Sequence, residues 1–190
     1  MLMNPDWKQT RLSSTVTVAK YEQLEASRDK DGIANFVIER FTERYVTPMR
    51  VDTSKKHGFT IMAVSCLLIE ALESFYQGWP DSRGREPLAF CNFFDRNKDF
   101  RFMRGQSQYF YKNVRCGILH QGETTGGWQV RRSGPIFEDK TRAINAKKFH
   151  DQVEKVLKGY CAELRKSDWS ASIWESLRKK MHAVCKNCER

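Results

Sequence analysis

The segment that most constrains the fold is the apolar stretch from Phe59 to Tyr76. Plotted as a helix, it is hydrophobic on almost every side. A helix without a polar face has to be buried, so we expect a central core helix covered by other helices. Its longest apolar run, residues 61–72, is too short for a membrane span and already contains Glu70. The segment therefore favours a helical bundle, and we expect no association with a membrane.

Other segments repeat apolar residues at helical spacing. They predict helices over residues 33–46, 106–121, 143–165 and 170–185, with one or two short helices within 86–103. Residues 128–132 and 135–137 flank Ser133-Gly134 and predict a small β-hairpin. The expected fold is mainly α, a helical bundle with a short β-hairpin insertion. We expect an N-terminal arm over 1–30, a helical domain over 31–166, and a C-terminal helix and tail over 167–190.

The charge of the chain indicates the class of partner. Lys and Arg number 33 and Asp and Glu 23, which gives a net charge of +10. Such an excess suits a polyanion, with nucleic acid first and an acidic membrane second. The N-terminus lacks the apolar core of a signal peptide, and the six cysteines are mostly isolated, as is common in cytosolic proteins. We therefore expect a cytoplasmic protein.

The segment from Tyr111 to Trp128 contains the candidate catalytic residues. Arg115 and His120 are separated by four residues of the expected helix 106–121. On a helical wheel, Phe110, Val114 and Ile118 form the core face. Arg115 and His120 lie on opposite flanks of a stripe made by Lys112, Cys116 and Leu119, about 7.5 Å apart along the axis. If this stripe met the same stripe of a second copy, two arginines and two histidines would share one cleft.

These two residue types suit phosphate chemistry. Histidine exchanges a proton near neutral pH, and arginine binds phosphate oxygens through its planar fork. Together they could activate a ribose 2′-hydroxyl and stabilise the charge that develops on the phosphate, without a metal. The alternative is structural. His120 could complement a helix dipole and Arg115 could be an ordinary surface arginine. Spacing alone leaves both interpretations open.

The sequence around the pair resembles a known family. NVRCGILHQGE, preceded by YFY and followed by GGW, is similar to the motif region of the HEPN superfamily of all-helical domains. The family motif is an Arg, four to six residues and a His, which corresponds to Arg115 and His120. The resemblance covers residues 30–165. Two positions depart from it: Cys116 stands where many members have Asn, and Gly122 stands where members controlled through a tyrosine have Tyr.

The resemblance implies a metal-independent endoribonuclease that acts as a homodimer in toxin–antitoxin or phage-defence systems. It implies no cofactor and no metal ion, and an antitoxin or sensor protein is a possible partner. Arg115 and His120 would be catalytic, with Asn113, Glu70 and Lys112 as supporting residues. Because some members have lost catalysis, the alternative is a non-catalytic nucleic-acid-binding or assembly module of a defence complex.

Several other residues are candidates with structural alternatives. Glu70, on the apolar helix, needs a partner, and Arg115 is one possibility; another is a purely structural ion pair with a different basic residue. Cys185 and Cys188 form only half of a zinc site. Gly126-Gly127-Trp128 favours a tight turn over a phosphate loop. A phosphate-tracking surface with stacking rings, or else a solvated face over core aromatics, would be made by Arg101, Arg104, Tyr109, Tyr111, Arg131 and Arg132.

Overall fold

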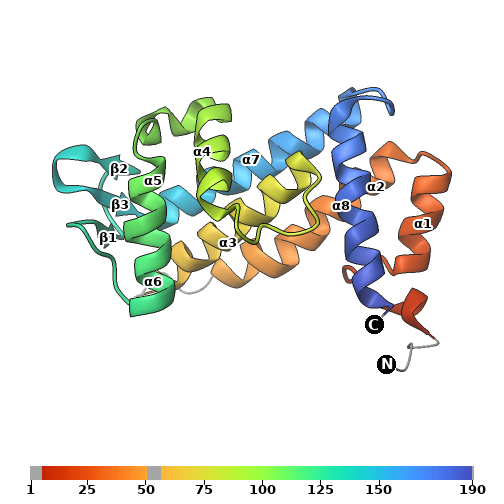
Figure 1. Ribbon diagram of the computed structural model, residues 1–190, viewed down its shortest axis with the longest axis horizontal. Helices are drawn as coiled ribbons and strands as arrows, with labels where there is room; N and C mark the ends of the chain where they lie inside the picture. The colour runs from red at the N-terminus through yellow and green to blue at the C-terminus, as the bar shows by residue number, and fades with distance from the viewer. Residues whose placement is uncertain (1–5, 51–56, 190) are drawn as a thin grey trace. The chain divides into compact units, whose positions relative to one another are not determined.

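The computed structural model describes residues 6–50 and 57–189 (Figure 1). The chain divides into two compact units, each built from segments that are distant in sequence. The first contains the described parts of Met1–Pro48, Ser74–Asp81 and Leu157–Arg190, and the second contains those of Met49–Glu73 and Ser82–Val156. Two long helices, α3 (Gly58–Gln77) and α7 (Ala146–Lys166), contribute residues to both units. The mainly α fold with a short β insertion is confirmed.

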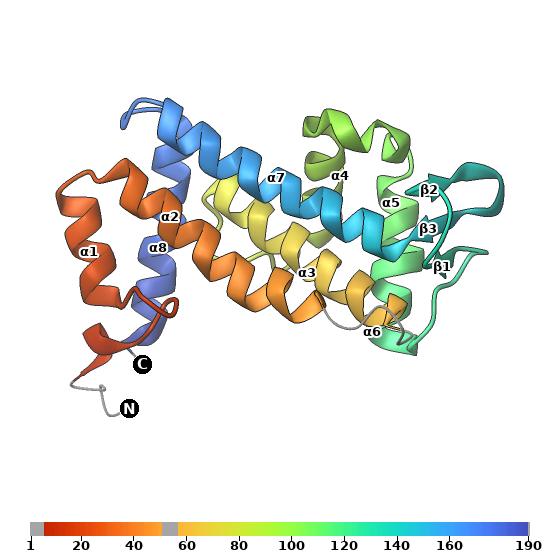
Figure 2. The same ribbon diagram turned by 180° about the vertical axis from the view of Figure 1, so that it is seen from behind.

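The first unit is helical. It contains α1 (Val18–Ala26), α2 (Lys30–Phe41) and α8 (Ser172–Cys188), which lie side by side in Figures 1 and 2. The expected N-terminal arm is thus wrong in part, because residues 18–26 form a packed helix. The Thr17 side chain caps α1 by accepting a hydrogen bond from the Lys20 amide at 3.2 Å. Val18, Tyr21 and Leu24 are buried on the inner face of this helix.

The second unit contains the remaining elements. Its short helices are α4 (Glu86–Arg96), α5 (Ser107–Phe110) and α6 (Cys116–Gln121), and its strands are β1 (Gln129–Arg131), β2 (Phe137–Glu138) and β3 (Ala143–Asn145). The expected core helix corresponds to α3, in which Met62, Cys66, Leu68, Ile69 and Leu72 are fully buried. This part of the sequence-based prediction is confirmed.

Helix α3 also meets a simple membrane criterion. By length and composition alone it could cross a membrane, and 61% of its most apolar 18-residue window is buried inside the protein. A core helix passes the same test, so the criterion is weak evidence here.

Stacked aromatic rings form the core of the second unit. Phe110 packs against the rings of both Phe94 and Phe149, with centroid distances of 5.2 and 5.4 Å. Trp128 packs edge-on against Phe110 at 6.0 Å and stacks on Phe137 at 5.6 Å. These contacts join α4, α5, α7 and the strands. The helix that carries Arg115 is therefore fixed from within by Phe110.

The expected β-hairpin is wrong in its pairing. The three strands have the order β1-β3-β2, with β1 parallel and β2 antiparallel to β3. β3 occupies residues that were expected to begin the long helix, so α7 begins at Ala146. Ala143, Ile144 and Asn145 are all buried, as suits a central strand. Strands β1 and β2 pair with β3 on either side and not with each other.

Candidate active site

The helix that carries the Arg-x4-His motif has three parts. α5 is followed by a π-helical turn over Tyr111–Arg115 and then by α6. Gly122 ends α6 in the left-handed conformation, with φ at 69°, as is common for a glycine that follows the last turn of a helix. Single π-helical turns within α-helices are frequent at functional sites. Here the turn contains Arg115 as its last residue.

Arg115 is held from two sides. Its Nε donates to Glu70 Oε1 at 2.8 Å and its Nη2 contacts Glu70 Oε2 at 3.5 Å. The guanidinium also lies over the Tyr111 ring, 5.5 Å from the centroid. The bonds to Glu70 leave Nη1 unused, Cys116 interacts with the same guanidinium, and 15% of the Arg115 side chain is exposed. The pairing of Glu70 with Arg115 was one of the possibilities left open by the sequence.

The surroundings of Arg115 preserve its charge. Burial works against the charged form, but the hydrogen bond and the charge of Glu70 outweigh it and raise the pKa of Arg115. Burial, followed by a hydrogen bond and charge interaction with Cys116, raises the pKa of Tyr111 to about 12. Near neutral pH, Tyr111 is therefore a neutral ring beneath a charged guanidinium.

Two carboxylates of α3 serve as anchors for arginines. Glu70 also accepts a hydrogen bond from Ser82 Oγ at 3.3 Å. Glu73, one helical turn away and fully buried, forms an ion pair with Arg96 of α4. The pair of Arg96 with Glu73 was not predicted from the sequence. The signal was the spacing of the two carboxylates, which places both on one face of an apolar helix where each needs a cation.

His120 lies in the last turn of α6 and is exposed. Its ring makes no hydrogen bond or ion pair within the described residues. Leu119, beside it, is 41% exposed, and Lys112 is also exposed. In the stripe that was expected to face a second copy, Lys112 and Leu119 are therefore exposed and Cys116 is half-buried. The structure does not bring Arg115 and His120 into contact with each other.

The core face of the helix differs in one position from the prediction. Phe110 and Val114 are buried as expected, but Gly117 replaces Ile118, which is only half-buried. The reason is the loop that follows α6. A Cβ at Gly117 would lie 2.5 Å from the Glu123 carbonyl oxygen, so only glycine lets this loop pack so closely.

Asn113 holds the same loop to the helix. Its Nδ2 donates to the Tyr109 carbonyl at 2.9 Å, and its Oδ1 accepts from Thr125 Oγ1 at 2.9 Å. The backbone carbonyl of Asn113 accepts from the Thr125 amide at 2.9 Å. Both side-chain polar atoms of Asn113 are thus used within the chain. Through these bonds Asn113 positions the turn that leads to Trp128.

The glycine pair ahead of Trp128 forms the tight turn that the sequence favoured. Gly126 and Gly127 have φ values of 61° and 79°, a region that favours glycine. Trp128 packs back onto the bundle and is buried.

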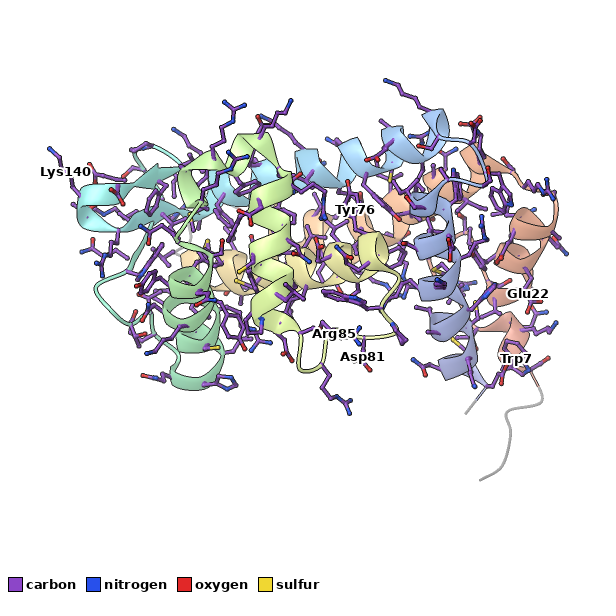
Figure 3. The ribbon with its side chains drawn as sticks, turned by 45° about the horizontal axis from the view of Figure 1, so that its top comes forward. Trp7, Glu22, Tyr76, Asp81, Arg85 and Lys140 are labelled. Atoms are coloured by element: carbon purple, nitrogen blue, oxygen red, sulfur yellow. The ribbon has the colours of Figure 1, made fainter. Side chains whose placement is uncertain are left out.

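The expected RNA-binding residues all belong to the second unit, and most are exposed. Tyr109 is 61% exposed, whereas Tyr111 is half-buried beneath Arg115. Arg131 pairs with Glu138 at 3.1 Å and contacts Gln129 at 2.8 Å, so part of its charge is compensated. Lys140, between β2 and β3, points outward (Figure 3). The exposed basic members of the predicted set are Arg101, Arg104, Arg131 and Arg132.

Cysteine and histidine do not form a metal site in the described ranges. Within residues 6–50 and 57–189, no three His, Cys, Asp or Glu side chains are placed to hold a metal ion. The Cys188 thiol instead donates to the Val184 carbonyl at 3.4 Å.

Comparison with known proteins gives no family for this chain. No protein-family model matches it, and neither curated proteins nor solved structures provide a significant match.

Proposed function

We propose that the chain is a metal-independent endoribonuclease that acts as a homodimer through the helix containing Arg115 and His120. The observation that carries the proposal is the state of Arg115. Its Nε and Nη2 are oriented by Glu70, while Nη1 takes no part in that pairing and the side chain is partly exposed. An arginine held in this way needs little reorganisation to bind a phosphate oxygen.

His120 supplies the second half of the proposed chemistry. Its ring is exposed one helical turn beyond Arg115 and makes no hydrogen bond within the described residues. It would take the proton from a ribose 2′-hydroxyl while Arg115 stabilises charge on the phosphate. Two copies that pack through Lys112, Cys116 and Leu119 would place both pairs in one cleft. The exposure of Leu119 supports this choice of face.

The resemblance to the HEPN superfamily supports a biological context for the proposed ribonuclease. It points to a cytoplasmic effector of a toxin–antitoxin or phage-defence system, with RNA as its target and an antitoxin or sensor protein as its regulator. The excess of basic residues fits an RNA partner.

A second function has its own supporting observation. The ion pair with Glu70 offsets the charge of Arg115, which weakens its attraction for a phosphate. A non-catalytic module could use Glu70 and Arg115 only to hold α3 against the helix that carries the motif. The exposed basic residues would then bind nucleic acid without cleaving it.

One assay separates the two functions. Labelled RNA is incubated with the purified protein in EDTA, beside His120→Ala and, as a matched control, His182→Ala. His182 pairs with Glu25 at 2.9 Å in the first unit. The enzyme predicts cleavage that survives chelation, disappears in His120→Ala and persists in His182→Ala. Intact RNA with a retained gel shift in all three proteins favours the binding module.

A further inference from the structure

An open groove of about 750 Å³ runs between α4 and the helix that carries the motif. One wall is a stripe of α4 at helical spacing, Pro87, Cys91 and Asp95. The other is the stripe Gln108, Lys112 and Cys116. α4 and α5 lie side by side in Figures 1 and 2. The volume lies within the usual range for small-ligand sites, about 300–1,000 Å³.

The lining combines flat apolar surface with unused polar groups. Cys91 and Cys116 are half-buried, and the Tyr109 and Tyr111 rings also line the groove. The side chains of Asp95, Gln108 and Lys112 make no hydrogen bond or ion pair within the described residues. Planar aromatic ligands suit such a groove, because rings pack on thiols and phenols while their edges bond to the polar groups.

The groove ends beside the candidate active site. Tyr111 lines it and also lies beneath the Arg115 guanidinium. A nucleotide whose phosphate met Arg115 could therefore place its base in the groove, with Lys112 near its backbone.

We propose that this groove binds one unstacked base of single-stranded RNA, and that Asp95 selects a base with an exocyclic amino group. This rests on the proposed function, since it takes the phosphate at Arg115 as the anchor. A carboxylate only accepts hydrogen bonds, so it pairs with the exocyclic amino group of cytosine, adenine or guanine, a group that uracil lacks. The groove shares Lys112 and Cys116 with the face proposed for dimer formation, so RNA would enter from the common cleft.

The test measures binding separately from cleavage. Fluorescence anisotropy is recorded for r(A)6, r(C)6 and r(U)6 with the full-length His120→Ala protein. We expect r(A)6 and r(C)6 to bind roughly tenfold more tightly than r(U)6. Adding Asp95→Ala should reduce that preference to less than about threefold. The control Asp139→Ala removes the same charge from an exposed position outside the groove and should keep the preference.

A second readout guards against variants that fold poorly. Binding of r(C)6 should slow the alkylation of Cys91 by iodoacetamide while Cys188 reacts as before. Equal affinity for the three RNAs, or equal effects of Asp95→Ala and Asp139→Ala, overturns the base groove. If cleavage by the unmutated protein persists in that case, only the groove is lost. If the base preference holds but no RNA is cleaved, only the nuclease proposal is lost.

Discussion

The guanidinium of Arg115 is fixed by a carboxylate on one side and a phenol ring on the other. Both partners orient the guanidinium. Glu70 occupies Nε and Nη2, and Tyr111 lies beneath the plane. The sequence offered Glu70 as one possible partner because a carboxylate in an apolar helix needs a cation. The contact with Tyr111 could not be predicted, since it depends on the π-helical turn.

A double-mutant cycle measures the pair directly. Glu70→Gln, Arg115→Met and the double variant are compared with the parent protein by urea unfolding. Both side chains are largely buried, so we expect each single change to cost about 1–3 kcal/mol. The double variant should cost less than the sum of the two, with a coupling of about 0.5–3 kcal/mol. Strictly additive costs would show that the pair contributes nothing to folding.

At the scale of elements, the helix over residues 107–121 depends on the loop that closes against it. Asn113 binds Thr125, and Gly117 lets the loop approach the helix backbone. The sequence predicted this helix, because the periodicity of apolar residues is a local signal. It did not predict the π-helical turn, which has no comparable local signal. The strands were located, but their pairing was wrong, because β1 meets β3 across a longer segment of chain than a hairpin spans.

Two glycine substitutions test this account of the loop. Gly117→Ala would place a Cβ against the Glu123 carbonyl, so we expect a loss of stability of about 1–3 kcal/mol and weaker RNA cleavage. Gly159 in α7 is exposed, and an added Cβ there meets nothing within 4 Å. Gly159→Ala should therefore stabilise by about 0.5–1 kcal/mol. Thermal unfolding measures whether each variant is more or less stable than the parent protein. Similar changes in the two variants would contradict the close packing of the loop against Gly117.

At the scale of the whole molecule, buried thiols make stability depend on pH. Burial raises the pKa of the Cys161 thiol to about 12, against an ordinary value of about 8.5. Below pH ~8.5 the thiol is protonated in both states. Between ~8.5 and 12 only the unfolded chain loses the proton, so the folded state loses relative stability as pH rises. Burial raises the pKa of the Cys66 thiol in the same direction.

The expected result is a free energy of unfolding that declines above pH ~8.5, by about 1.4 kcal/mol per pH unit for each such thiol. Cys161→Ala should make this decline less steep by the contribution of one thiol. This holds whatever the difference in the free energy of unfolding between the two proteins at pH 7. Urea unfolding at pH 7.5, 9 and 10 measures both slopes. Parallel curves for the two proteins would mean that Cys161 is not protected from ionisation in the folded state.

Net charge and the spacing of apolar residues were enough to predict a basic, mainly helical protein with α3 in its core. The division into two units was not predictable, because each unit joins segments far apart in the sequence. The groove was missed for a similar reason. Each of its stripes is visible at helical spacing, but only tertiary packing shows that they face each other.

The most direct test of the central claim is complementation between two inactive copies. Arg115→Ala and His120→Ala chains are co-expressed with different tags, and the mixed dimer is purified through both. If two copies share one cleft, each variant alone is inactive, while the mixed dimer cleaves RNA with the one arginine and the one histidine that remain. A stable mixed dimer without activity, or a parent protein that is monomeric while it cleaves RNA, would contradict the composite site.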